Sequence, residues 1–385
     1  MTAAPPIAVP PLALYVHWPY CARICPYCDF NVVRDRGQAE QAALAAAIVA
    51  DLKAQAAGIG PRRLVSVFFG GGTPSLMDPA WLAAVVEAAR ALWPAEARLE
   101  VTLEANPTDA EADRFAAFAA AGVTRLSLGL QSLDDAALAF LGRNHDAAQA
   151  LRAARAARAA FPQLSLDLIY ARPGQDVAAW TTEIDATLAL APDHLSPYQL
   201  TIEAGTAFDR QVRRGAFAPP DDDLAAGLYE ATQARLGDAG FDAYEVSNHA
   251  RGEAARSRHN LAYWRGEDYL GVGPGAHGRV SLGGVRHARF TAPKVARYLA
   301  RVTETGTGLV ENAPLSPAEA ATERLLMGLR IPEGVALREL GELAPPPERI
   351  DGLVEAGLLA ADPHRLRATP HGRRLLDRLT LELLG

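Results

Sequence analysis

Short β-rich runs alternate with longer Ala- and Leu-rich stretches over the first 240 residues of the chain. In the longer stretches apolar residues recur every three to four positions, which is the spacing of one helix face. The β-rich runs cover residues 12–17, 64–69, 98–103, 124–128, 164–169 and 194–201, and the helical stretches cover about 38–57, 79–93, 109–121, 147–160, 177–190 and 222–239. This alternation predicts strand–helix–strand units and a parallel sheet.

Six strand–helix units are too few for a closed eight-unit barrel. They fit an α/β fold with a partial, TIM-like (βα)6 barrel, and the same pattern also fits a doubly wound sheet. Polar residues or glycines follow four of the runs: segment 21–28, segment 70–74, Glu104 and Gln131. Because parallel α/β proteins build their sites at the carboxyl ends of strands, we expect the chemistry to gather there.

The pattern changes beyond about residue 310. Three helices, a short hairpin and a last helix are expected at about 316–329, 335–343, 347–356, 358–368 and 370–383. This order predicts a mostly helical, winged-helix-like domain, so we divide the chain into residues 1–310 and 311–385. Residues 315–385 contain nine arginines and eleven acidic residues, which is a poor surface for phosphates. We therefore expect this domain to pack or to dock a partner rather than to bind DNA.

Composition excludes several classes of function. The 385 residues are 49% hydrophobic and carry a net charge of −7, so the chain has no overall basic field for nucleic acid or an anionic membrane. No run of eighteen apolar residues occurs, and residues 1–11 have neither the basic nor the apolar region of a signal peptide. We expect a cytoplasmic protein in which the thiols stay reduced.

All three cysteines of the chain lie within eight residues. Cys21, Cys25 and Cys28 form a C-x3-C-x2-C loop directly after the first predicted strand. Thiolates are the preferred ligands of iron–sulfur clusters, and a cubane normally takes four of them. Three cysteines therefore predict a [4Fe–4S] cluster with one open iron. The alternatives are free thiols or a zinc site with His17 or Asp29 as fourth ligand, although zinc loops usually pair their cysteines in two knuckles.

This cysteine loop, placed after the first strand, resembles the signature of the radical S-adenosylmethionine (SAM) superfamily. The resemblance implies a partial (βα)6 barrel in which the amine and carboxylate of SAM chelate the open iron. It also implies that reduction of the cluster cleaves SAM to a 5′-deoxyadenosyl radical. The segment 70–74, Gly-Gly-Gly-Thr-Pro, is similar to a motif of these proteins and implies binding of the SAM amino group near Gly72 and Thr73.

Further residues match positions that this family uses around SAM. They are Glu104, Gln131, Arg143 and Asp167. A guanidinium suits a carboxylate, and Asp or Gln suits ribose hydroxyls, although each residue alone is also compatible with an ion pair or a cap. Tyr15 and Tyr27, beside and within the cysteine loop, are expected to pack on the cofactor or simply in the core.

Over nearly its whole length the chain resembles the HemN/HemW group of this superfamily. Its members include an oxygen-independent coproporphyrinogen III dehydrogenase and a heme chaperone. The dehydrogenase has a further cysteine two residues after the third ligand, where this chain has Phe30. The segment 259–264, His-Asn-Leu-Ala-Tyr-Trp, is similar to the H-N-x-x-Y-W motif of the chaperone, and so are the flanking segments 244–249 and 269–277.

The resemblance implies that His259 ligates heme and that Tyr263 and Trp264 cover the porphyrin. A His-Asn pair that merely caps and packs the open side of the barrel is the alternative, and His17, His145, His249 and His277 are rival ligands. We expect heme, acceptor haemoproteins and an electron donor for the cluster as partners. Decarboxylation of a porphyrinogen is the alternative function. SAM cleavage, a homodimer and peripheral membrane association stay open, and no catalytic residue is assigned.

Overall fold

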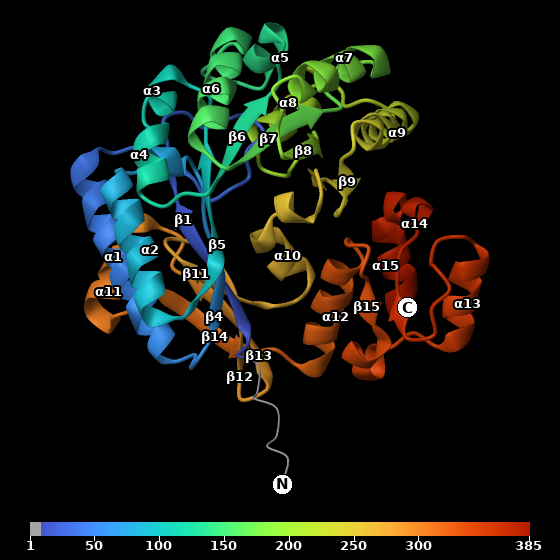
Figure 1. The fold of residues 1–385 in the computed structure, drawn as a ribbon. Coiled ribbons are helices and arrows are strands. Elements are labelled where there is room, and N and C mark those ends of the chain that lie inside the picture. The colour runs from blue at the N-terminus through green and yellow to red at the C-terminus, as the bar shows by residue number, and fades with distance from the viewer. Residues whose placement is uncertain (1–8) are drawn as a thin grey trace.

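One twelve-stranded sheet organises the chain, of which the computed structural model describes residues 9–385 (Figure 1). The opening segment 1–11 therefore lies mostly outside the described residues. The strand order is β14-β13-β12-β11-β1-β4-β5-β6-β7-β8-β10-β9. Six neighbouring strands run parallel and build the predicted partial barrel: β1 (Pro11–Trp18), β4 (Arg63–Gly71), β5 (Ala95–Ala105), β6 (Arg125–Gln131), β7 (Gln163–Tyr170) and β8 (His194–Gln199).

Helices cover the outer face of these strands (Figure 1). They are α1 (Gln38–Ala57), α2 (Pro79–Leu92), α3 (Asp109–Ala112), α4 (Phe115–Ala120), α5 (Asp135–Phe140), α6 (Ala147–Ala160), α7 (Val177–Leu188), α8 (Ala207–Arg213) and α9 (Asp222–Asp238). Alternation along β6 shows how the sequence makes two faces, because Leu126, Leu128 and Leu130 are fully buried in the main core with the helices. Ser127 and Gly129, between them, line a pocket inside the barrel.

Both edges of the barrel are extended. β11 (Asp268–Val272) runs parallel to β1 and continues into antiparallel β12 (His277–Leu282), β13 (Val285–Thr291) and β14 (Leu309–Pro314). At the other edge, β8 pairs with β10 (His249–Ala250), which pairs with β9 (Asp242–Ala243). Between the two edges lies α10 (Arg258–Trp264), which contacts β1, β4, β11 and the C-terminal helix α12 (Pro317–Gly328) (Figure 1). The short pair β2 (Tyr20–Cys21) and β3 (Val33–Arg34) frames the cysteine loop, and α11 (Val295–Thr305) packs on α1.

The C-terminal region has its own apolar core, which includes Leu325, Leu329 and Leu379. After α12 it contains β15 (Val335–Ala336), α13 (Pro347–Glu355), β16 (Arg365–Leu366), α14 (Pro370–Arg374) and α15 (Leu376–Leu384). This arrangement agrees with the predicted helical, winged-helix-like domain. The division near residue 310 stays a prediction, and β14 spans that point as the last strand of the main sheet.

Three predicted helices differ from the structure, and the last of them, predicted at 370–383, is divided at Leu375 into α14 and α15. The stretch 109–121 is divided into α3 and α4 at Arg114, whose guanidinium donates to the carbonyl of Ser75 at 2.7 Å. The stretch predicted as a helix at 335–343 is β15 followed by two 3-10 turns. Gly334 and Gly341 have φ angles of 65° and 55°, so the chain leaves the right-handed helical region just before this segment and again within it.

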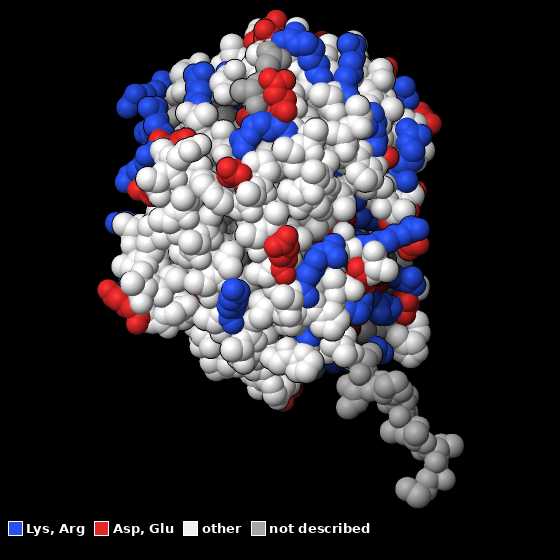
Figure 2. Space-filling view, turned by 60° about the vertical axis from the view of Figure 1, so that its left-hand side comes forward, with Lys and Arg blue, Asp and Glu red and all other residues white. Residues whose placement is uncertain are grey.

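The surface carries no large field of one sign on the face that Figure 2 shows, where basic and acidic side chains are intermingled around a broad uncharged area. This agrees with the net charge of −7. Among the described residues, no helix is both long and apolar enough to cross a bilayer.

A buried carboxylate on α1 links this early helix to residues 298–308, and its removal tests the packing between them. Asp51 on α1 is fully buried and accepts hydrogen bonds from the hydroxyls of Tyr298 at 2.7 Å and Thr307 at 2.8 Å, and from the N–H of Gly308 at 2.9 Å. Asp51→Ala leaves these buried donors without an acceptor, so it should lower the free energy of unfolding by about 3 kcal/mol or more. Urea unfolding measures the loss.

Asp185→Ala is the matched control. It removes the partly exposed ion pair of Asp185 with Arg235 and should cost less than about 1 kcal/mol. Equal losses in the two variants would contradict the anchoring role of Asp51.

Candidate functional site

The cysteine loop lies at the mouth of a pocket of about 540 Å³ inside the barrel. Cys21 ends β2 and is buried, whereas Cys25 and Cys28 are partly exposed, and all three line the pocket. The N–H of Cys28 donates to the carbonyl of Cys25 at 3.2 Å, so these two residues form a tight turn. Side chains from elsewhere in the chain reach the sulfurs: Thr73, after β4, lies 3.6 Å from Sγ of Cys21, and Arg143, between α5 and α6, lies 3.5 Å from Sγ of Cys25.

A zinc ion is the alternative to a cubane at this loop. In the part of the chain that the structure describes, no three His, Cys, Asp or Glu side chains are grouped closely enough to hold one metal ion. Cysteines that hold a cubane bind different irons and therefore stand farther apart. His17, the alternative fourth ligand, has both ring nitrogens engaged, with the hydroxyl of Tyr15 at 3.0 Å and the carbonyl of Asn31 at 2.9 Å.

Burial raises the pKa of the Cys21 thiol and raises that of Cys28 to about 11. Iron binds the thiolate form, so occupation of the site releases protons from these thiols.

The glycine segment after β4 holds the cysteine loop in place. The N–H of Gly72 donates to the carbonyl of Trp18 at 2.7 Å, and the N–H of Thr73 donates to that of Tyr20 at 2.8 Å. A Cβ on Gly72 would lie 2.6 Å from the oxygen of Tyr20, so this approach requires glycine. An ammonium group only donates hydrogen bonds, so the predicted binding of such a group near Gly72 and Thr73 would use oxygens there.

The four polar residues predicted around SAM all line the pocket: Glu104, Gln131, Arg143 and Asp167. Glu104 accepts from the N–H of Gly71 at 3.1 Å, and burial together with the nearby Asp167 raises the pKa of its carboxyl to about 8. Asp167 accepts from the hydroxyl of Ser127 at 2.8 Å, and burial raises its pKa to about 6. Such shifts are typical of functional sites.

Hydrogen bonds orient the side chain of Arg143, and an unusual backbone conformation orients that of Gln131. Arg143 donates to the carbonyl of Gly129 at 3.0 Å and to the side-chain oxygen of Asn106 at 2.5 Å. Gln131 follows a β-bulge and has a φ angle of 62°, an uncommon conformation for a residue with a Cβ. Among the described residues, Nε of Arg143 and Oε1 of Gln131 are buried without a hydrogen-bond partner. Both atoms are therefore available to a ligand.

The two tyrosines differ. Tyr27 lines the pocket and lies 3.4 Å from Nη1 of Arg143. Tyr15 is turned toward His17 and stacks on Phe68, and it is not among the lining residues that the structure describes. Polar side chains that the sequence did not single out also line the pocket, among them Asn106, Ser127, Ser165, His194, Ser196 and Tyr198. Most of them occupy alternate positions of strands, on the side that faces into the barrel, and this alternation is the signal in the sequence that could have found them.

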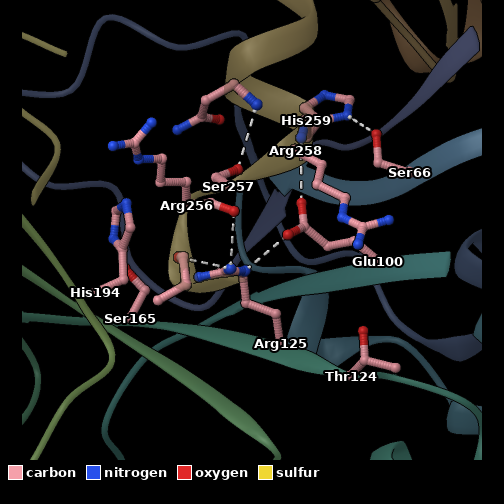
Figure 3. A network of polar contacts seen from close by, with 12 residues as sticks. Ser66, Glu100, Thr124, Arg125, Ser165, His194, Arg256, Ser257, Arg258 and His259 are labelled. Carbon is pink, nitrogen blue, oxygen red and sulfur yellow. Dashed lines mark hydrogen bonds and ion pairs between the residues drawn. The ribbon is translucent and has the colours of Figure 1, made fainter. Parts of the chain in front are cut away.

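The His-Asn-x-x-Tyr-Trp segment forms α10, which closes the inner end of the barrel. His259 is 1% exposed, and one ring nitrogen lies 3.0 Å from the hydroxyl of Ser66 (Figure 3). The other ring nitrogen lies 3.1 Å from the hydroxyl of Tyr263. Burial lowers its pKa to about 3. In this conformation His259 thus offers no unbonded nitrogen to a ligand. Asn260, its neighbour, does line the pocket.

The aromatic residues of the same helix pack away from the cysteines. Tyr263 contacts Tyr269 edge to face, with ring centroids 4.2 Å apart, and the guanidinium of Arg330 lies 4.6 Å above the ring of Trp264. The predicted porphyrin-covering role of Tyr263 and Trp264 therefore stays a prediction.

Three of the rival histidines, His17, His145 and His249, are buried. His145 and His249 bond to the carbonyl of Leu130 and the side chain of Gln233, and burial lowers the pKa of each to about 4. His277 is exposed and stacks on Phe290.

The buried neutral His259 predicts acid sensitivity. Its folded pKa of about 3 lies below the ordinary 6.5, so the unfolded chain binds the extra proton and stability falls as pH drops below 6.5. At pH 5 this residue costs about 2 kcal/mol. His259→Gln should therefore narrow the difference between the unfolding free energies at pH 7.5 and pH 5 by about 2 kcal/mol. The exposed His371→Gln should leave it unchanged; the same difference in wild type and His259→Gln would refute a neutral His259.

Comparisons with known proteins agree with this site. The Radical SAM superfamily pattern matches residues 15–183, and the HemN C-terminal domain matches residues 315–375. The chain is 44% identical to the mitochondrial radical S-adenosyl methionine domain-containing protein 1 of Bos taurus, over 97% of this chain and 87% of that protein. It is 38% identical to the heme chaperone HemW of Mycobacterium tuberculosis (strain CDC 1551 / Oshkosh), over 99% and 96%.

The structure of coproporphyrinogen III oxidase (HemN) from Escherichia coli superposes with a TM-score of 0.82 at 22% identity, over 98% of this chain and 91% of that one. This match confirms the predicted fold class. Identity and coverage together show that the chain belongs to the radical SAM superfamily and, within it, to the HemN/HemW family.

Proposed function

We propose that this protein is a heme chaperone of the radical SAM type, which binds heme and passes it to acceptor haemoproteins. The observation that carries the proposal is the pairing of a three-cysteine loop with Phe30, where the dehydrogenase has a fourth cysteine. Phe30 is 63% exposed and lines the mouth of the pocket, so an apolar ring stands there in place of a thiol. Relatives named heme chaperone HemW, at 33–38% identity, support the same function.

Different residues of the pocket hold the cluster and the different groups of SAM. Cys21, Cys25 and Cys28 hold the cluster, and bound SAM supplies a radical precursor or a regulatory ligand. Arg143 offers Nε to a carboxylate, and Asp167 offers carboxylate oxygens to ribose hydroxyls. Gln131 offers Oε1 to a donor, while Glu104 at neutral pH carries a proton that it loses when a cation approaches.

Heme ligation by His259 requires α10 to leave its place in the barrel. That movement breaks the contacts of His259 with Ser66 and Tyr263 and removes the Arg330 guanidinium from Trp264. The proposal therefore includes two conformations, closed as observed and open when heme is bound. An external electron donor and the acceptor haemoprotein complete the set of partners.

Porphyrinogen decarboxylation is the second candidate, because the fold superposes on HemN over nearly the whole chain. Phe30 disfavours it. A single anaerobic preparation of the full chain with reconstituted cluster separates the two functions.

Titration with heme should give a saturable Soret shift, and the loaded protein should transfer heme to an apo-haemoprotein. His259→Ala should change the Soret position or weaken binding at least tenfold, because an axial ligand is lost. His371→Ala, on the exposed C-terminal surface, is the control. The absence of a saturable shift, or protoporphyrinogen formed from coproporphyrinogen III with SAM and dithionite, would overturn the chaperone proposal. An unchanged spectrum in His259→Ala would remove His259 as the ligand.

A further inference from the structure

Four buried polar atoms that line the pocket have no hydrogen-bond partner among residues 9–385. Two of them, on Gln131 and Arg143, belong to the residues already placed around SAM. The other two are Oγ1 of Thr102 and Nη1 of Arg125. The proposed function uses neither Thr102 nor Arg125, although burying a donor without an acceptor is costly.

Thr102 and Arg125 lie side by side at the inner end of the pocket. The register of β5 and β6 places them directly opposite each other. Glu104 lies two residues further along β5, which is about 7 Å nearer the cysteine end. Ser257 and Asn260, at the start of α10, also line the pocket, so Thr102 and Arg125 form its floor beside that helix.

Hydrogen bonds fix the Arg125 guanidinium at Nε and Nη2, whereas Nη1 has no partner among the described residues. Its side chain is 3% exposed, and Nε donates to Glu100 at 3.1 Å (Figure 3). Nη2 donates to the carbonyls of Ala255 at 2.8 Å and Arg256 at 3.3 Å. These contacts fix the guanidinium plane and leave the N–H groups of Nη1 without a partner in the described chain. In the closed conformation this donor is therefore already oriented for an acceptor.

We propose that Thr102 and Arg125 form a carboxylate subsite on the pocket floor, which binds a propionate group of heme. Both free groups are donors, and the guanidinium is cationic, so the complementary ligand group is an oxyanion. A propionate is a carboxylate on a short flexible arm. The subsite rests on the proposed function, since heme is the ligand that brings the propionate.

The surrounding charges permit this ligand. Glu100 pairs with the opposite edge of Arg125. Glu104 lies nearer the cysteine end of the pocket. Burial and the neighbouring Asp167 raise the pKa of Glu104 to about 8, so this carboxyl is mostly uncharged at neutral pH. The carboxylate of SAM has the same chemistry as a propionate, and the experiment must distinguish these two sources.

The test compares heme with heme dimethyl ester, in which both propionates are blocked, on the full chain with reconstituted cluster. Wild type should bind heme at least tenfold more tightly than the ester, because a hydrogen bond to a charged group is worth one to two orders of magnitude. Thr102→Val keeps the shape and removes the hydroxyl, so it should weaken heme binding by about tenfold and leave ester binding unchanged. Arg125→Lys keeps the charge and should reduce the preference for heme as well.

Thr380→Val, a buried threonine in the C-terminal core, is the matched control and should keep the wild-type preference. Equal binding of heme and ester by wild type would overturn the subsite while heme binding stands. Loss of SAM affinity in Thr102→Val with the heme preference retained would assign the floor to SAM and also overturn it. If wild type binds neither heme nor ester, the proposed function fails together with the subsite.

Discussion

The close backbone contact between the glycine segment and the cysteine loop is the constraint on which the site depends. Two hydrogen bonds, from Gly72 to Trp18 and from Thr73 to Tyr20, tie the end of β4 to the loop that carries the cysteines. The missing Cβ of Gly72 permits that distance. Because β4 also pairs with β1 and β5, the loop takes its position from the sheet. The sulfurs thereby face Thr73, after β4, and Arg143, between α5 and α6.

Many polar side chains line the interior of the barrel below that loop, and α10 closes it. Glu100 receives the N–H of His259 at 3.1 Å and also the guanidinium of Arg125, which in turn holds the carbonyls at the start of α10. The His-Asn-x-x-Tyr-Trp segment is thus a structural part of the closed barrel. Binding of a large planar ligand through this segment would have to be accompanied by rearrangement of the same contacts, which couples the chaperone function to the pocket.

The sequence predicts the regular parts of this structure well. Periodicity alone finds the six barrel strands and places α1 and α6 at their observed bounds, since long amphipathic stretches and buried alternating runs carry strong signals. Segment 335–343 is missed because two left-handed glycines and a two-residue strand override its helical composition. The edge strands β9 and β10 are too short to show a period.

The same contrast holds for the site. Count and spacing identify Cys21, Cys25 and Cys28, and strand-end position identifies the residues near them. The burial of His259 is a tertiary outcome, because it depends on Ser66 and Tyr263 meeting the ring from two elements. The free donors of Thr102 and Arg125 are likewise visible only when the strands are paired.

The most direct test of the open-iron cluster is electron paramagnetic resonance of the reduced, anaerobically reconstituted full chain, recorded with and without SAM. Binding of SAM to an open iron predicts a signal of a reduced [4Fe–4S] cluster that changes when SAM is added. Cys25→Ser should lose both the signal and the change. A cluster signal that SAM leaves unaltered in wild type, or full retention of both features in Cys25→Ser, would contradict the account.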